Sequence, residues 1–115
     1  MQLDEIDRRI LRELQQNGRL QNIELAKRVG LSPSPCLRRV KLLEEAGIIS
    51  RYVAVIDQAR VGLTLSLFAR VSLTAQDAET IDHFIAAMKR LPEVVECYIM
   101  LGESDALLRV VVSDL

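Results

Sequence analysis

Apolar residues in the first half of the chain recur every three to four positions in three successive segments. This spacing predicts helices over about 4–17, 22–29 and 32–45. Asp4 suits the start of the first helix, and Gly30 suits the end of the second. Short helices joined by a tight turn in this way are typical of a helix-turn-helix unit, which can lay one helix in a DNA major groove.

The third predicted helix has two candidate starting residues. Ser32 and Ser34 can each accept a hydrogen bond from the free amides of a first helical turn, and each precedes a proline suited to that turn. Leu37, Val40 and Leu43 share one stripe of this helix. The stripe predicts an apolar inner face and a cationic outer face.

After the third helix the period changes to that of a strand. Residues 48–56 are rich in β-branched side chains, which predicts a wing or a strand leading away from the helices. The pattern divides the chain into a winged helix-turn-helix domain over 1–51, a linker strand and turn over 52–62, and a second domain over 63–115.

The second domain follows the order strand, helix, strand, strand. Residues 65–73 alternate with period two, and 77–90 carry an apolar stripe at helical spacing. Two further strands, 94–101 and 106–112, are joined by the turn 102–105 and predict an antiparallel hairpin. This order is that of an incomplete ferredoxin-like βαββαβ unit, so the expected fold class is α+β.

Charge is divided unequally between the two halves, although the net charge is only −1. Residues 1–51 carry ten Lys and Arg against seven Asp and Glu, whereas residues 52–115 carry five against nine. The first half is therefore suited to attract phosphate. A solvated helical face has a similar composition, so charge alone does not select DNA.

Composition indicates a cytoplasmic protein with reduced thiols. No apolar run approaches the length of a membrane span, and the acidic, amphipathic start is unlike a secretory signal. Cys36 and Cys97 lack the spacing of metal ligands, and His83 is the only histidine. We therefore expect no catalytic residue, no metal site and no cofactor.

Three cations, Arg38, Arg39 and Lys41, cluster in the third predicted helix. Arg38 and Lys41 are three residues apart and share a face, which we expect to meet DNA, with Arg39 flanking it on the phosphate side. The alternative is a solvated helix surface whose cations pair with Glu44 or Glu45.

Four further residues at the start of this helix are candidates for DNA contact. In helix-turn-helix proteins, side chains at this position reach bases or phosphates. Capping of the helix is the alternative role, and both roles can hold together. The four residues are Ser32, Ser34, Pro35 and Cys36.

Arg51, at the edge of the predicted wing, suits a contact with backbone phosphate, and a purely structural role is equally open.

These motifs together resemble the Lrp/AsnC (feast/famine) family of transcription regulators over nearly the whole chain. Members join an N-terminal winged helix-turn-helix to a C-terminal ferredoxin-like domain that dimerises and senses small molecules, often amino acids. The resemblance rests on LDEIDRRIL at 3–11, NGR at 17–19, LSPSPCLRRVK at 31–41, LEEAGII at 43–49, and GESD at 102–105 with the following leucines.

The chain departs from the family pattern at two points. Ala106 follows the Gly-x-x-Asp turn where the family often has Tyr, and the last helix and strand of the ferredoxin-like unit are absent. We therefore expect a C-terminally truncated regulatory domain. An unpaired sheet edge and an uncovered apolar face would favour association.

Gly102 and Asp105 are the candidate effector residues that the resemblance suggests. A glycine exposes backbone amides to a carboxylate, and an aspartate can receive an ammonium, which are the two groups of a free amino acid. The alternative is an ordinary hairpin turn, in which both residue types are common.

The expected function is that of a DNA-binding transcription regulator, a homodimer or higher homo-oligomer that responds to a small-molecule effector. One alternative is a truncated partner module that associates with full-length relatives. The other is an enzyme, because siroheme decarboxylases resemble this family in fold. That branch carries histidines after the wing, whereas residues 55–60 contain none here, so we expect no enzyme.

Overall fold

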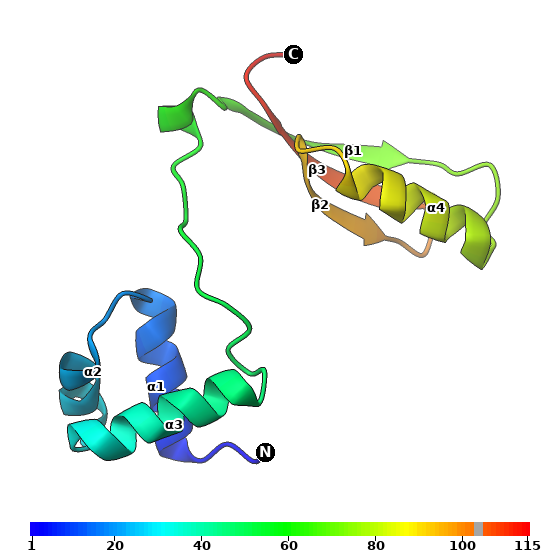
Figure 1. The fold of residues 1–115 in the computed structure, drawn as a ribbon. Helices are drawn as coiled ribbons and strands as arrows, with labels where there is room; N and C mark the ends of the chain where they lie inside the picture. Colours follow the sequence, from blue (N-terminus) through cyan, green and yellow to red (C-terminus); the bar gives the residue numbers. More distant parts are fainter. Residues whose placement is uncertain (103–104) are drawn as a thin grey trace. The chain divides into compact units, whose positions relative to one another are not determined.

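The computed structural model describes residues 1–102 and 105–115, and the chain forms two compact units, Met1–Val55 and Ile56–Leu115. Figure 1 shows the helices and strands of both units. The first contains helices α1 (Glu5–Gln16), α2 (Asn22–Val29) and α3 (Pro33–Glu45). The second contains a short 3-10 helix (Ala59–Val61), β1 (Leu65–Val71), α4 (Ala78–Lys89), β2 (Val94–Ile99) and β3 (Ala106–Val112).

Two aspartates define the start of α1. The Asp7 amide donates to Asp4 Oδ1 at 2.8 Å, and the Asp4 amide donates to Asp7 Oδ2 at 3.2 Å. This reciprocal pair is a capping box, which satisfies two amides that would otherwise lack partners. The predicted helix over 4–17, with Asp4 at its start, is thereby confirmed.

The turn between α2 and α3 depends on Gly30. Its φ of 75° lies in the left-handed region that glycine adopts without a steric penalty. The Leu31 amide then donates to the Ala26 carbonyl at 2.9 Å and closes the end of α2. At the other end of α2, Asn22 Nδ2 donates to the Pro33 carbonyl at 2.8 Å, which ties the starts of α2 and α3 together.

The predicted serine cap of α3 is absent from the structure. Ser32 is the residue before the helix, as expected, but its side chain accepts no capping hydrogen bond. The sequence explains part of this: a capping side chain bonds the amide two or three residues on, and Pro35, at the third position, has none, which leaves only the Ser34 amide.

The core of the helical unit lies between all three helices. The prediction for the inner stripe of α3 was partly wrong: Cys36, Val40 and Leu43 face the core, whereas Leu37 is 43% exposed. Steps of four and three residues keep the first three within one narrow sector, and Leu37 lies about 100° from Cys36. The fully buried core consists of Ile10, Leu25, Ala26, Val29, Cys36 and Leu43.

The predicted strand over 48–56 is not formed. Residues 50–57 are irregular, and no described segment forms a ladder with them. A strand needs a neighbour for its amides and carbonyls, and β-rich composition does not supply one. Tyr52 from this segment packs instead beside Gly18, just beyond α1.

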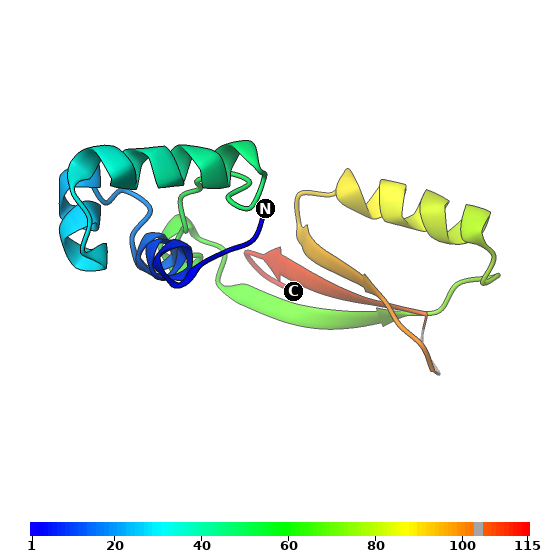
Figure 2. The same ribbon diagram turned by 90° about the horizontal axis from the view of Figure 1, so that it is seen from below.

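The second unit is a three-stranded sheet with the order β1-β3-β2, and both pairings are antiparallel. The predicted order and the β2–β3 hairpin are confirmed, although Glu103 and Ser104 of its turn lie outside the described residues. Figures 1 and 2 show α4 along one face of the sheet. Along β1, half-buried and exposed residues alternate, which is typical of a sheet with one covered face.

Replacing Leu43 by Ala should lower the free energy of unfolding of the helical unit by about 2–5 kcal/mol, because it leaves a cavity in a filled core. Leu42→Ala is the matched control, since Leu42 is 48% exposed and its truncation should change stability by about 0.5 kcal/mol or less. Urea unfolding followed by circular dichroism at 222 nm measures both. Equal effects of the two variants would contradict the orientation of α3.

Candidate nucleic-acid interface

The side of α3 that points away from the core forms a shallow groove. All of the residues that line it are exposed. We call this surface the outer face of α3; it consists of Ser34, Leu37, Arg38, Lys41, Leu42 and Glu45. Three predicted DNA-contacting residues, Ser34, Arg38 and Lys41, are therefore brought together on one side of one helix.

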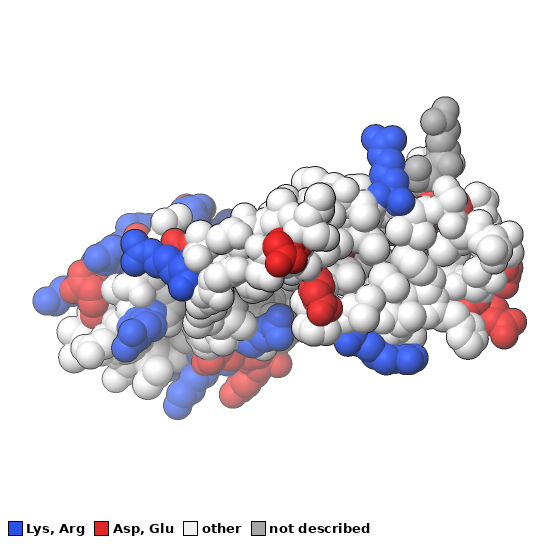
Figure 3. All heavy atoms as spheres, turned by 90° about the horizontal axis from the view of Figure 1, so that it is seen from above, with Lys and Arg blue, Asp and Glu red and all other residues white. Residues whose placement is uncertain are grey.

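Arg38 and Lys41 have no ion-pair partner within the part of the chain that the structure describes. In particular, neither pairs with Glu44 or Glu45, so the alternative of an ion-paired helix surface is not realised there. Unpaired guanidinium and ammonium groups on a solvated face retain their full capacity to bind phosphate or base edges. Figure 3 shows Lys and Arg side chains projecting from the helical unit, with acidic side chains between them.

Arg39 has a different environment from its two neighbours. Its Nη1 lies 2.8 Å from Asp4 Oδ1, 2.7 Å from Asp4 Oδ2 and 3.1 Å from Asp7 Oδ1. Asp7 is only 4% exposed. We call these three residues the Asp4–Asp7–Arg39 clamp; it joins the middle of α3 to the capped start of α1. Sequence reasoning missed it because the partners are more than thirty residues apart.

The clamp shifts the titration of its charged groups. The hydrogen bond from Arg39 lowers the pKa of Asp4 below its ordinary value of 3.8, and the bonds to Asp4 and Asp7 raise the pKa of Arg39. Both shifts favour the charged forms. The guanidinium of Arg39 is thus held by carboxylates and lies on a different side of α3 from Arg38 and Lys41.

The predicted DNA contact by Cys36 is wrong. Its side chain is fully buried in the core of the helical unit, and burial raises the pKa of the thiol. A side chain enclosed by three helices cannot reach a base. Of the other residues at the start of α3, Ser32 is exposed and Pro35 is half-buried.

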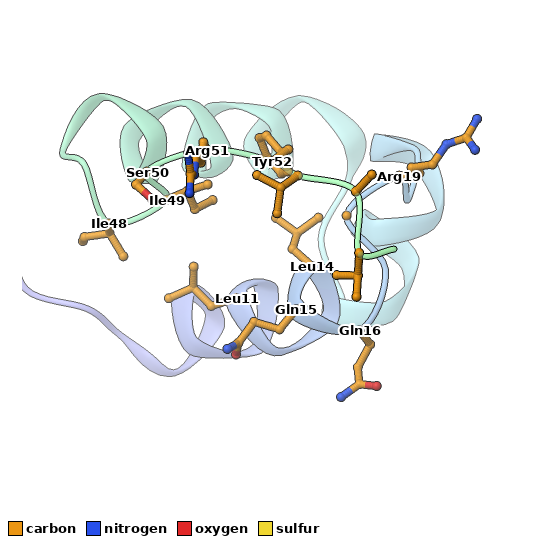
Figure 4. Close-up of a pocket in the computed structure, with 14 residues that line it drawn as sticks. Leu11, Leu14, Gln15, Gln16, Arg19, Ile48, Ile49, Ser50, Arg51 and Tyr52 are labelled. Carbon is orange, nitrogen blue, oxygen red and sulfur yellow. The ribbon is translucent and has the colours of Figure 1, made fainter. Parts of the chain in front are cut away.

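Arg51 lies on the segment after α3 rather than on its outer face. This segment and α1 border a groove of about 730 Å³. Figure 4 shows Leu11 and Leu14 pointing toward the segment, whereas Gln16 and Arg19 point away. The pKa of Tyr52 on the same segment is raised, mainly by burial and to a smaller extent by the negative charge of Glu44. Arg51 is exposed.

Asp105, in the second unit, is bonded within its own domain. Its Oδ2 accepts from the Leu73 amide at 2.7 Å, and its Oδ1 accepts from Gln76 Nε2 at 2.6 Å. These bonds fix the loop between β1 and α4, which is the role of a structural turn residue. Gly102 is exposed, and its φ of 129° requires glycine.

Metal ligands do not gather in the described ranges 1–102 and 105–115, where no three His, Cys, Asp or Glu residues form a metal-binding group. His83 is exposed on α4, with Nε2 4.0 Å from Glu79 Oε1. Cys36 and Cys97 are both free thiols. Over the same described residues, none of the helices has the length and apolar character needed to cross a membrane.

The helix pair with its solvated cationic face, followed by a separate sheet-and-helix unit, defines a two-domain protein of the helix-turn-helix class. Residues 3–50 match the winged helix-turn-helix DNA-binding family, and residues 66–115 match the Lrp/AsnC ligand binding domain. The chain belongs to the Lrp/AsnC family of transcription regulators.

Individual relatives agree with this assignment. The transcriptional regulator AzlB of Bacillus subtilis is 40% identical over 98% of this chain and 72% of its own length. The leucine-responsive regulatory protein of Salmonella typhimurium is 43% identical over 98% of this chain and 69% of its own length. These relatives are regulators of transcription, and the chain is accordingly a DNA-binding regulator with a ligand-binding domain and not an enzyme.

Solved structures show the same fold. A transcriptional regulator of Neisseria meningitidis in complex with L-Met has a TM-score of 0.92 and 48% identity, covering 99% of this chain and 73% of that one. An AsnC family regulator of Agrobacterium tumefaciens has a TM-score of 0.94 and 42% identity, covering 98% and 74%. The α+β fold class is thereby confirmed.

Asp4→Asn should lower the melting temperature at neutral pH, because the amide keeps the helix cap but loses the charged partner of Arg39. Since the pKa of Asp4 is depressed by folding, its contribution is complete above 3.8 and disappears as the pH falls below that value. The difference between variant and wild type should therefore shrink steadily as the pH falls below 3.8. Thermal unfolding from pH 7 to pH 2.5 measures it.

Glu5→Gln is the control for this experiment, because Glu5 pairs with Arg12 on an exposed surface and such pairs contribute little. A loss in the Asp4 variant that stayed constant down to the lowest pH would contradict a charge-based role for the clamp.

Proposed function

We propose that the outer face of α3 enters the DNA major groove, with Arg38 reading a guanine and Lys41 bonding phosphate. The observation that carries this assignment is the grouping of Ser34, Arg38 and Lys41 on one exposed face, where neither cation has an ion-pair partner among the described residues. The major groove admits one α-helix, and the first turns of a recognition helix meet the base edges.

The other predicted contact residues have different roles, because they lie at different positions on α3 or on the segment that follows it. Ser32 and Ser34 stand exposed at the start of α3, and Ser34 supplies an amide to a phosphate where the neighbouring prolines cannot. Pro35 shapes this turn at the DNA surface, and Arg51 adds a phosphate contact from the following segment. Arg39 contributes indirectly, by holding α3 in place through the Asp4–Asp7–Arg39 clamp.

We further propose that the working regulator is a homodimer or higher homo-oligomer in the cytoplasm, where it reaches DNA. The sheet carries exposed aromatic side chains, Phe68 on β1 and Tyr98 on β2. Exposed apolar side chains on a sheet favour association with a second copy. Two copies present two recognition helices to half-sites spaced by a helical turn of DNA.

The ligand of the second domain is, we propose, an amino acid. The match to a ligand binding domain supports a small-molecule effector, and the Neisseria meningitidis relative was solved with L-Met. The Gly102 amide suits a carboxylate, and Asp105 keeps lone pairs for an ammonium besides its bonds to the loop before α4. An effector that binds one assembly state better shifts the population toward that state.

Arg38→Ala should weaken binding to the selected operator by about 1–3 kcal/mol and relax the preference at one base pair per half-site. Arg12→Ala is the matched control, because it removes the same charge from the exposed surface of α1. Fluorescence anisotropy with a set of single-base operator variants measures affinity and preference together. An Arg38 variant with unchanged affinity and preference would refute the proposed reading face.

Lys41→Ala should weaken binding to all duplexes to a similar extent, because a phosphate contact carries no sequence information. The slope of log affinity against log salt concentration should also become shallower by about 1. Titrations at several salt concentrations measure the slope. A Lys41 variant that changes base preference with the slope intact would contradict the phosphate assignment.

At least one free amino acid should change operator affinity about fivefold or more, in line with ordinary coupling between two sites. Asp105→Asn should reduce that response, whereas Asp114→Asn, an exposed carboxylate near the chain end, should preserve it. Anisotropy titrations with the twenty amino acids provide the measurement. Absence of any response in the wild type would remove the amino-acid assignment and leave the DNA assignment standing.

A further inference from the structure

Leu37 and Leu42 are apolar side chains, which gain nothing from contact with phosphate. They are 43% and 48% exposed on the outer face of α3, beside Arg38 and Lys41. The core of the helical unit is complete without them, because Cys36 and Leu43 fill the inner side of the same helix. The two leucines flank Arg38 and Lys41 and give the outer face of α3 apolar borders that are free for an apolar contact with a ligand.

Leu37 belongs to a second surface feature besides the outer face of α3. It also borders a small apolar hollow on the near side of α3, together with Leu14, Val40 and Tyr52. Leu37 thus adjoins apolar residues of the helical unit on one side, while 43% of it remains exposed to solvent.

The position of Leu37 along α3 places it where bases are read. Ser34, Leu37 and Arg38 occupy the first exposed turn, with Leu37 three residues and Arg38 four residues after Ser34. Residues at these spacings are neighbours on a helix surface. Leu42 lies on the opposite border of the outer face, one turn further from the start of the helix.

The major groove offers one exposed methyl group, that of thymine at C5. We propose that Leu37 is a specificity-determining residue that packs against a thymine methyl next to the guanine read by Arg38. This inference rests on the proposed placement of the outer face in the groove. In this arrangement Leu37 recognises a thymine through an apolar contact, and Arg38 recognises the neighbouring guanine through hydrogen bonds.

Replacement of single thymines by deoxyuridine tests the proposal, because it removes only the methyl group. The operator is first selected from random duplexes with wild-type protein, and each thymine is then replaced in turn. We expect one replacement per half-site to weaken wild-type binding by about three- to tenfold. Leu37→Ala should bind the thymine and deoxyuridine duplexes with affinities within about twofold of each other.

Two further variants separate this contact from general effects. Leu37→Met keeps an apolar side chain of similar reach and should retain the sensitivity. Val55→Ala truncates an apolar side chain that is 94% exposed and lies outside the outer face of α3, so it should retain the sensitivity in full. Circular dichroism confirms that each variant is folded. A wild type insensitive at every thymine, or a Leu37→Ala protein with undiminished sensitivity, would overturn the proposal while DNA binding stands. Failure of the wild type to select any duplex would overturn the proposed function as well.

Discussion

The rotation of α3 about its own axis is the constraint on which the interface depends. Cys36, Val40 and Leu43 are packed against Ile10 and the buried side of α2, and this packing determines which residues face outward. A helix with one buried stripe has no freedom to turn without exposing that stripe to water. The outer face of α3 is therefore a consequence of the core, which sets the direction in which the backbone of α3 presents its cations.

A second constraint fixes the position of α3 relative to α1. The Asp4–Asp7–Arg39 clamp joins α3 to the capped start of α1 through three short charge-assisted contacts, one of them to a nearly buried carboxylate. Arg38 and Arg39 are thus neighbours of identical chemistry with opposite uses. Arg38 is exposed to solvent, whereas Arg39 is bound to two carboxylates and holds α3 in place. The difference arises because about 100° of helical rotation separates them.

The sequence predicted the helices, the hairpin and the exposed pair Arg38 and Lys41, because period and turn chemistry are local. It failed for features that depend on contacts between residues far apart in the sequence, or on the exact angular position of a residue around its helix. Val40 and Leu43 face the core as predicted, but Cys36 and not Leu37 completes the buried stripe of α3. Asp4 and Arg39 meet across thirty-five positions. The strand over 48–56 needed a partner that composition does not reveal, and Pro35 excludes only one of the two amides that a Ser32 cap could bond.

In the proposed complex, the outer face of α3 lies in the major groove with Arg38 on a guanine. Dimethyl sulfate methylates guanine N7 in that groove, so protection of N7 on the selected operator tests it most directly. We expect wild-type protein to protect the guanine that Arg38 reads in each half-site, and Arg38→Ala protein bound to the same operator to leave that guanine open to methylation. Equal N7 protection by both proteins, or no protected guanine at all, would contradict it.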